Sequence, residues 1–406
     1  MNLEELASEF KAGFEPRFDN DEYLRFCHKK KVHLATPCIH IVGTNGKSSV
    51  GKMLSDIYAA SNYRVGLFLP DFFASPCEMI SVNGKSISED ELSSLLTKRQ
   101  DDFKKFDLNP LEKIVVLAYD YFSTQSLDLA VLCAHMGGGL DPTNIEDMDQ
   151  RLVVLTNVEL DHTEYLGTTL SQIGMNKIAL LRERTPLLHG DLEEGCRKVT
   201  RDYAESLDSP YVEVDDYHFH HIVGTAFHFD YRPFKDLAVN SLAESMVYNA
   251  SLAIEATKIL QQSLPVSEEA IRKGLMEKPL PLHYERIGNI IFDCANNVDA
   301  IASTVKALPT LSSHRLVHAI FAARQEKNIA AMLPPLGNYG CDIHLSTFSS
   351  PLAKVEEDYF IFTGDYPFHE NPAEIVKTLQ ISNPDDAILI IGDRELAYQV
   401  KKDLLL

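Results

Sequence analysis

A glycine-containing loop with one lysine and two following hydroxyls is the segment of this sequence best suited to chemistry. The loop lies between an apolar run, CIHIV at 38–42, and a segment at 48–63 with helical periodicity. Backbone N–H groups and the positive end of the following helix can bind a phosphate there. The lysine would reach the terminal phosphates, and a hydroxyl after it would assist Mg²⁺. The predicted phosphate-binding residues are Gly43, Thr44, Asn45, Gly46, Lys47, Ser48 and Ser49. The alternative, a glycine turn with a chance lysine, is disfavoured by the flanking strand and helix.

Strand-like apolar runs alternate with helix-like segments along the whole chain. Buried strands are predicted at 127–134 and 151–158, and an amphipathic helix at 241–262. After a proline-containing linker at 277–286 the same alternation restarts with NIIFDCA, RLVHAIFAA, CDIHLSTF and AILIIGD. This pattern predicts an α/β fold with parallel sheets, divided near residue 280 into domains at 1–280 and 281–406.

Charge and composition limit the partners of this chain. The 38 Lys and Arg against 59 Asp and Glu give a net charge of −21, and no basic cluster is evident, which disfavours a nucleic-acid partner. No apolar run is long enough to cross a bilayer, and the acidic start of the chain is unlike a signal peptide, so a cytoplasmic location is expected. Seven cysteines without a CxxC pair predict reduced thiols. No Cys/His cluster has the sequence spacing of a zinc site.

Several blocks resemble the folylpolyglutamate synthase/dihydrofolate synthase family of the Mur ligase superfamily. The phosphate loop is one residue shorter than the general GxxxxGK[ST] pattern and resembles the family's GTNGKGS. The other matching blocks follow in family order between about 38 and 300: Gly137-Gly138 with Leu140-Asp141 and Thr143-Asn144, Thr156-Asn157 with Asp161-His162, Asn176-Lys177, Asn249-Ala250, and Phe292-Asp293 with Asn297.

The resemblance implies a P-loop Mur-ligase-like ATPase domain at 1–280 and a smaller Rossmann-like glutamate-ligase domain at 281–406, with ATP and substrate in the cleft between them. ATP would phosphorylate a folate-type carboxylate, and the amino group of L-glutamate would displace the phosphate. Whether dihydropteroate is also a substrate stays open. The resemblance also implies ATP and Mg²⁺ as cofactors and a monomer without nucleic-acid or membrane partners.

Four residues carry the catalytic and metal roles that the resemblance implies. Lys47 would neutralise charge on the transferring phosphoryl group. Ser49 and His162 would bind Mg²⁺. Lys177 corresponds to a lysine that is carbamylated in the family and lies near the metal. Taken alone, His162 fits a paired loop histidine and Lys177 fits a solvated helix lysine, so these roles depend on the shared order of the blocks.

Three further residues correspond to nucleotide contacts of the family. Asn249 matches its adenine-side asparagine and Asp293 its ribose-side aspartate. His283 stands where the family has a phosphate-reaching arginine, and histidine is shorter and only partly charged at neutral pH. Taken alone, Asn249 fits a core hydrogen bond and Asp293 a turn or helix cap.

The sequence departs from the family pattern near the metal. Pro70 replaces a serine, Cys133 a glutamate and Asn296 a histidine. A thiol is a poor ligand for the hard cation Mg²⁺, and Asp71 or His135 are the neighbouring candidates to substitute. Three hypotheses therefore stay open: a working divergent ligase, a nucleotide- or folate-binding relative with lost catalysis, and a ligase for another acid.

Overall fold

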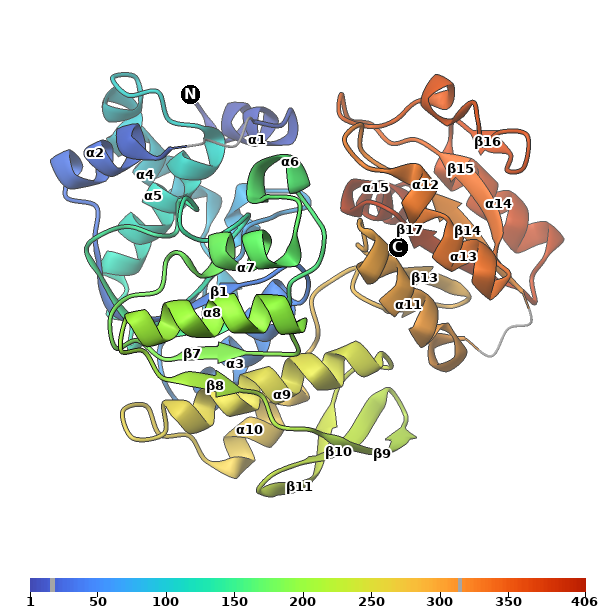
Figure 1. Cartoon of the computed structure of the whole chain (residues 1–406). Coiled ribbons are helices and arrows are strands. Elements are labelled where there is room, and N and C mark those ends of the chain that lie inside the picture. The colour runs from blue at the N-terminus through green and yellow to red at the C-terminus, as the bar shows by residue number, and fades with distance from the viewer. Residues whose placement is uncertain (15–18, 313–315) are drawn as a thin grey trace. The chain divides into compact units, whose positions relative to one another are not determined.

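The computed structural model describes residues 1–14, 19–312 and 316–406, which form two compact units (Figure 1). Unit 1 comprises Met1–Asn240 and Met246–Lys278. Unit 2 comprises Ser241–Ser245 and Pro279–Leu406.

Unit 1 is built on a large, mostly parallel sheet. Its strands are β1 (Leu34–Val42), β2 (Val65–Phe68), β3 (Ile80–Val82), β4 (Lys85–Ser86), β5 (Leu129–Cys133), β6 (Met148–Leu155), β7 (Leu187–His189) and β8 (Tyr211–Glu213). Within the described residues the order of the eight strands is β4-β3-β2-β5-β1-β6-β7-β8. The pairs β2–β3 and β3–β4 are antiparallel, and the other pairs are parallel. β1 is therefore central, and the phosphate loop follows its carboxyl end, where ligands bind in open parallel sheets.

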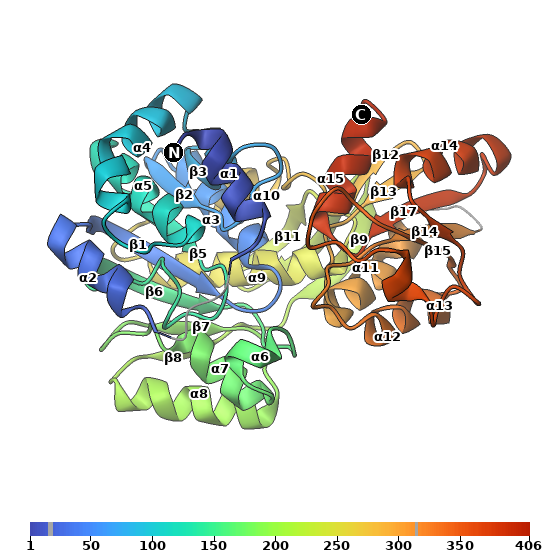
Figure 2. The ribbon, with the colours of Figure 1, turned by 90° about the horizontal axis from the view of Figure 1, so that it is seen from above.

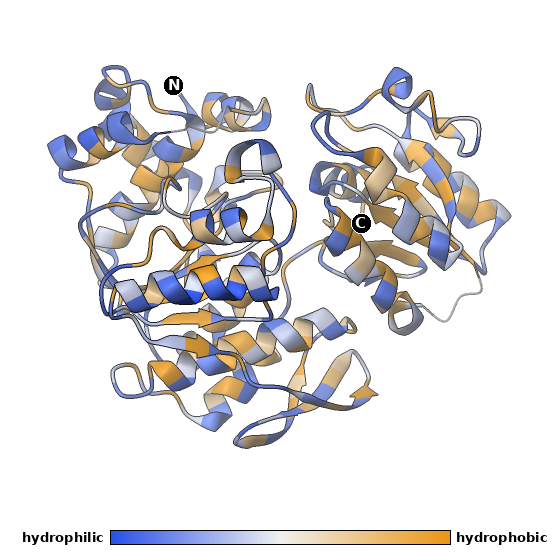
Figure 3. Ribbon diagram, viewed as in Figure 1, coloured by the Kyte–Doolittle hydropathy of each residue, from blue (hydrophilic) through white to orange (hydrophobic). Residues whose placement is uncertain are grey.

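Helices cover both faces of this sheet. They are α1 (Leu3–Lys11), α2 (Asp21–Lys30), α3 (Lys47–Ala60), η1 (Pro76–Met79), α4 (Glu89–Phe103), α5 (Pro110–Thr124), α6 (Thr163–Leu166), α7 (Leu170–Ile178), α8 (Glu194–Ser206), α9 (Glu244–Ile259) and α10 (Glu268–Leu275). Figure 2 shows α4 and α5 beside β1–β3 and shows α7 and α8 beside β7 and β8. The strands appear hydrophobic in Figure 3, as strands covered on both faces must be.

A second, antiparallel sheet extends unit 1. Its strands are β9 (His218–Val223), β10 (Ala226–Tyr231) and β11 (Phe234–Val239), in the order β11-β10-β9. β10 is mostly buried whereas every residue of β9 is exposed.

Unit 2 is a smaller parallel sheet with helices around it. Its strands are β12 (Glu285–Ile287), β13 (Ile290–Phe292), β14 (Val317–Phe321), β15 (Asp342–Ser346), β16 (Phe368–His369) and β17 (Ala387–Ile391). Its helices are α11 (Val298–Leu311), α12 (Ile329–Met332), α13 (Pro334–Tyr339), η2 (Glu356–Tyr359), α14 (Pro372–Ser382) and α15 (Arg394–Asp403). The strand order is β12-β13-β17-β14-β15-β16, with only β12 antiparallel among the described strands.

The α/β architecture predicted from the apolar runs is confirmed, with two local corrections. The helix predicted at 241–262 is α9, but it is not amphipathic, because polar residues such as Ser251 and Thr257 are buried together with its apolar ones. The strand predicted to continue to 134 ends at Cys133, so His135 lies in the following loop. Arg315, the first residue of the predicted run RLVHAIFAA, lies outside the described residues.

All seven cysteines lie in the described ranges and are free thiols, as the sequence predicts. Among the helices of the described residues, none combines the length and the apolar character that crossing a membrane requires.

Candidate active site

Two glycines give the phosphate loop its shape. Gly43 has φ +147°, and a Cβ there would lie 1.9 Å from the Thr156 hydroxyl oxygen. Gly46 has φ +83°, and a Cβ there would lie 2.5 Å from the Asn249 side-chain oxygen. Both positions therefore need glycine for backbone conformation and for close packing. Asn249, predicted from α9 to contact nucleotide, lies directly against the loop.

The end of β6 holds the loop in place through Thr156 and Asn157. The Asn157 carbonyl accepts a bond from the Thr44 N–H at 3.0 Å, and its side-chain oxygen accepts from the Asn45 N–H at 2.8 Å. The Thr156 hydroxyl donates to the Asn45 carbonyl at 2.6 Å. These bonds fix the loop backbone before any ligand binds, which is the pre-organisation that phosphate recognition requires.

The helix that follows the loop presents free donors to the site. Its first backbone bond runs from the Val50 N–H to the Gly46 carbonyl at 2.9 Å. The N–H groups of Lys47, Ser48 and Ser49 therefore have no acceptor inside the helix. With the positive helix end, they have the arrangement of donors that binds phosphate at helix N-termini.

Two lysines from different helices converge on one carbonyl of the loop. Lys47 Nζ donates to the carbonyls of Gly43 at 3.0 Å and Thr44 at 2.9 Å. Lys177 Nζ, from α7, donates to the same Gly43 carbonyl at 2.8 Å. Lys177 is buried, so it is not the solvated helix lysine of the alternative interpretation. Both amines therefore lie at the loop where a phosphate chain would bind.

Burial shifts the protonation of both lysines. It lowers the pKa of Lys177 to about 7, with the nearby Lys47 charge acting in the same direction. It also lowers the pKa of Lys47. Asp161 opposes both shifts through its negative charge. Lys177 is therefore partly neutral at physiological pH, and a neutral amine is the nucleophilic form of lysine.

The Asp161-His162 pair begins α6. His162 adopts φ +50°, and its N–H donates to Asp161 at 3.1 Å. Its Nε2 lies 3.8 Å from the Asp161 carboxylate. Asp161 was not among the residues assigned a role from the sequence, yet its charge acts on both lysines. The signal that could have found it is its carboxylate inside the matched DH block.

The donor set around the loop suits Mg²⁺ bound with nucleotide. Mg²⁺ keeps several waters and usually takes one or two protein oxygens together with phosphate oxygens. Ser49, in the first turn of α3, supplies a hydroxyl, and Asp161 supplies a carboxylate. His162 supplies an imidazole, which is a softer donor. The residues present therefore fit Mg²⁺ with fewer protein ligands than the family pattern provides.

Cys133 has a packing role. Its Sγ donates to the Lys47 carbonyl at 3.4 Å and lies 2.5 Å from where a Cβ on Gly51 would be. Burial raises the pKa of its thiol to about 12, so the sulfur is neutral and does not replace the family's metal-binding carboxylate.

The segment after β2 packs against the N-terminal helix. Phe72 lies against Phe10, with ring centroids 5.1 Å apart, and Lys11 Nζ donates to the Phe73 carbonyl at 2.8 Å. His135 lies 5.8 Å from Phe14, ring to ring, and 3.9 Å from the Asp71 carboxylate. Pro70 is buried. We call Phe10, Phe14, Phe72 and His135 the aromatic cluster; it belongs wholly to unit 1.

In unit 2, His283 and Asp293 form a close electrostatic pair. The Asp293 carboxylate accepts bonds from the N–H groups of Tyr284 at 2.9 Å and Ala295 at 3.0 Å, and from the Thr304 hydroxyl at 2.9 Å. Burial lowers the pKa of His283 and raises that of Asp293, and each opposes the shift of the other. Asp293 thus organises a turn, as its alternative interpretation predicts. Asn296 precedes the N-cap of α11, Asn297.

Two positioning residues carry no role in the sequence prediction. Tyr248 donates its hydroxyl to the Thr156 carbonyl at 2.7 Å and accepts from the Asp191 N–H at 2.8 Å. Asp141 accepts bonds from the N–H groups of His135 and Met136, at 2.8 and 3.1 Å, and so shapes the loop after β5. Both lie in or beside matched blocks, which was the available signal.

Known proteins share this sequence pattern and fold. No protein-family model matches the chain. It is 23% identical over 387 residues to the dihydrofolate synthase/folylpolyglutamate synthase of Bacillus subtilis (strain 168), and 26% identical over 386 residues to the folylpolyglutamate synthase of Lacticaseibacillus casei; each match covers 90% of both chains.

Solved structures of such enzymes have the same fold as this chain. The FPGS-AMPPCP-folate complex is matched with a TM-score of 0.85 and 25% identity over 100% of both chains. Escherichia coli FolC in complex with DHPP and ADP is matched with a TM-score of 0.87 over 99% of this chain and 97% of that one; at 22% identity this match supports the fold. The chain is therefore similar over nine-tenths of its length to folylpolyglutamate and dihydrofolate synthases, and it shares their fold.

Proposed function

We propose that this protein is an ATP-dependent amide ligase that adds L-glutamate to a folate-type carboxylate. The carboxylate oxygen attacks the γ-phosphorus of ATP, and ADP leaves. The neutral amine of glutamate then attacks the acyl phosphate. Phosphate leaves with one oxygen of the original carboxylate, and the amine loses a proton as the amide forms. The relatives named above are folylpolyglutamate and dihydrofolate synthases, and they cover nine-tenths of the chain.

The convergence of Lys47 and Lys177 on the Gly43 carbonyl carries this proposal. A scaffold without phosphate chemistry has no reason to bury two amines 2.8 and 3.0 Å from one carbonyl. An anionic phosphate chain would supply the compensating charge for Lys47. Lys47 and the first N–H groups of α3 then stabilise charge on the transferring group.

Mg²⁺ would lower the charge on the phosphate oxygens when bound with ATP, and Ser49, His162 and Asp161 are the residues that we propose hold it. The chain's own residues position the reactants. Asn157 and Thr156 fix the loop, and Asn249 is proposed to contact the adenine side of the nucleotide, because it lies directly against Gly46.

We propose that Lys177 is carbamylated, as the family resemblance implies. Its neutral amine adds CO₂ and releases a proton, which converts a buried cation into a carboxylate-like group. A pKa of about 7 makes the neutral form available. NMR of the protein in ¹³C-bicarbonate tests this directly: a carbamate signal in the wild type that is absent in Lys177→Gln supports it, and identical spectra contradict it.

Roles in unit 2 and the location are also proposals. The segment 281–406 is proposed as the glutamate-ligase domain and 1–280 as the ATP-binding domain. His283 and Asp293 are proposed to contact the nucleotide, on the resemblance of their positions. We place the protein in the cytoplasm, because its free thiols suit a reducing compartment. The monomeric state is proposed from the family resemblance.

A product assay by mass spectrometry tests the function. The purified protein is incubated with MgATP, L-glutamate and tetrahydrofolate, and a product heavier by one glutamyl residue is expected. Lys47→Ala should abolish it. Lys52→Ala is the matched control, because Lys52 lies on the same helix but pairs with Asp56 at 2.5 Å and should leave activity unchanged.

The negative outcome is equally informative. ADP binding without any glutamylated product from tetrahydrofolate or dihydropteroate would contradict the folate reaction. It would leave a nucleotide-binding relative or a ligase for another acid. The aromatic cluster motivates testing other aromatic acids in the same assay, since its rings suit contact with a planar substrate.

A further inference from the structure

Five titratable residues share one face of the sheet in unit 2. His318 pairs in register with Asp342, and Asp342 and His344 are two residues apart on β15, so all three side chains point to the same face. His369 pairs in register with the same-face position Ser346, and Asp386 precedes β17 on that face by the same alternation. The four strands lie side by side in the sheet in the order β17-β14-β15-β16 (Figure 1).

Three atoms of this cluster form a small triangle. His318 Nδ1 lies 2.9 Å from Asp342 Oδ2, and His344 Nε2 lies 3.2 Å from the same oxygen. The two ring nitrogens are 3.4 Å apart. Zinc bonds of about 2.0–2.2 Å in a tetrahedral site give ligand-to-ligand distances of about 3.3–3.5 Å. The triangle therefore nearly matches one face of a zinc coordination tetrahedron before any ion is bound.

The other nitrogen of each histidine also has a partner. His318 Nε2 lies 3.3 Å from Asp386, and His344 Nδ1 lies 3.2 Å from His369 Nε2. Metal-binding histidines characteristically donate their second N–H to a carboxylate or another acceptor, which fixes ring orientation and tautomer. His318 and His344 are 4% and 7% exposed, so both rings are held within the packed sheet.

A cation at the centre of the triangle would leave each ring nitrogen with a partner. His318 faces a carboxylate with each of its nitrogens. With a cation bound to Nδ1, the neutral ring donates its remaining N–H to Asp386. His344 likewise turns a lone pair toward the cation and donates its other N–H to His369.

We propose that His318, His344 and Asp342 bind Zn²⁺, with water as the fourth ligand and with Asp386 and His369 orienting the two rings. Two imidazoles and one carboxylate are a donor set that zinc accepts and that Mg²⁺ does not favour. Asp342 is about half exposed, which leaves a side open for water. The ion would tie β14 to β15, and this role is independent of the proposed ligase reaction.

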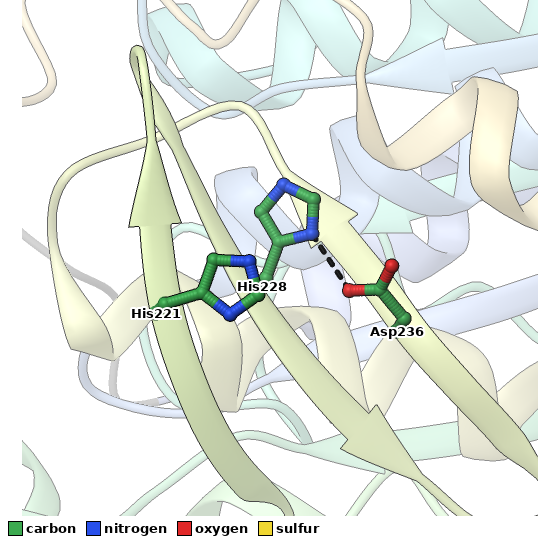
Figure 4. Close-up of side chains that lie close together, drawn as sticks. All are labelled: His221, His228 and Asp236. Carbon is green, nitrogen blue, oxygen red and sulfur yellow. Dashed lines mark hydrogen bonds and ion pairs between the residues drawn. The ribbon is translucent and has the colours of Figure 1, made fainter.

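A second group, His221, His228 and Asp236, serves as the comparison (Figure 4). His228 Nδ1 lies 2.8 Å from Asp236, but His221 stacks on His228 with an interplanar angle of 11° and a centroid distance of 4.8 Å. One ligand atom of each residue lies within 4.8 Å of the others, but His221 and Asp236 are exposed. This group therefore differs from the unit 2 cluster in its exposure and in the stacking of its rings.

Zinc titration of tag-free protein by calorimetry tests the proposal. A large excess of MgCl₂ saturates the metal position of the nucleotide site. The titration uses a background variant that carries both His221→Asn and His228→Asn, which removes the exposed group. One equivalent of Zn²⁺ should still bind. Adding Asp342→Ala should weaken binding at least about 100-fold, and adding Asp386→Asn should weaken it about tenfold, the lower end of effects from outer partners. Asp342 is half exposed, and circular dichroism of its variant in EDTA checks the fold.

Cobalt substitution identifies the ligands independently. Co²⁺ in the background variant should show the visible absorption of a four-coordinate site without thiolate charge-transfer bands. No binding in the background variant, unchanged affinity in Asp342→Ala with an intact fold, or a thiolate band would each overturn the proposal.

Discussion

Replacing Gly46 by alanine should destabilise unit 1 by more than its backbone conformation alone explains. Gly46 has φ +83°, and the left-handed conformation costs an L-residue about 1–2 kcal/mol. The new Cβ would also lie 2.5 Å from the Asn249 side-chain oxygen, which must move within a buried site. Such overpacking costs about 1–3 kcal/mol. The expected loss in free energy of unfolding is therefore about 2–5 kcal/mol.

Gly84 offers a matched control for the conformational part. Its φ is +76°, and no atom lies within 4 Å of a Cβ built there. Gly84→Ala should therefore cost only about 1–2 kcal/mol. Adding Asn249→Ala to Gly46→Ala should recover about 1–3 kcal/mol relative to additivity, because it removes the clashing oxygen.

Urea titrations read by hydrogen exchange of β1 and β6 peptides measure these values within unit 1, since the chain has no tryptophan to report unfolding. Calorimetry with ADP should show weakened binding in Gly46→Ala and unchanged binding in Gly84→Ala. Equal destabilisation by the two alanines, or no coupling with Asn249→Ala, would refute the packing of loop against α9.

Three further variants test separate parts of the site. Lys177→Met should lose ligase activity yet be more stable than wild type near pH 7 in CO₂-free buffer. Burial lowers the pKa of Lys177 in the folded protein to about 7 from 10.5, so between these pH values the unfolded wild type binds more protons and the stability of the wild type rises with pH. In urea titrations the stability advantage of the variant should therefore shrink toward pH 10. Cys133→Ala should keep substantial activity, and wild-type Cys133 should resist iodoacetamide in the folded state, since its thiol pKa is about 12; rapid labelling would contradict its buried, neutral state. Phe72→Ala should lower stability by about 3 kcal/mol and raise KM for the folate substrate while leaving KM for ATP unchanged; equal changes in both would argue against a substrate-side role for the aromatic cluster.

Continuous buried strands were the features that sequence predicted best. The run at 38–42 is unbroken by polar residues other than His40, and it forms the buried half of β1. The face of α9 was not predictable in this way, because Asn249, Ser251 and Thr257 are polar but buried. Their hydrogen-bond partners lie on the same helix, as in the bond from the Ser251 hydroxyl to the Val247 carbonyl at 3.0 Å. Polarity therefore did not mark the solvent side.

The site residues also divide into those that local sequence order predicts and those that only the fold brings together. The phosphate loop is local, so its glycines, lysine and hydroxyls were recognisable from order alone. The Lys177 contact with Gly43 joins residues 134 apart, and only the order of family blocks pointed to it. The His318, Asp342 and His344 cluster escaped the search for zinc spacing, because its ligands come from two strands whose register brings them together.

Transfer of oxygen from substrate to phosphate tests the central claim most directly. The terminal carboxylate of the folate substrate is labelled with ¹⁸O, and both products are analysed by mass spectrometry after turnover with MgATP and L-glutamate. Ligation through an acyl phosphate predicts one labelled oxygen in the released phosphate and one in the new amide carbonyl. Unlabelled phosphate, released without glutamylated product, would contradict the account and show that the site only hydrolyses ATP.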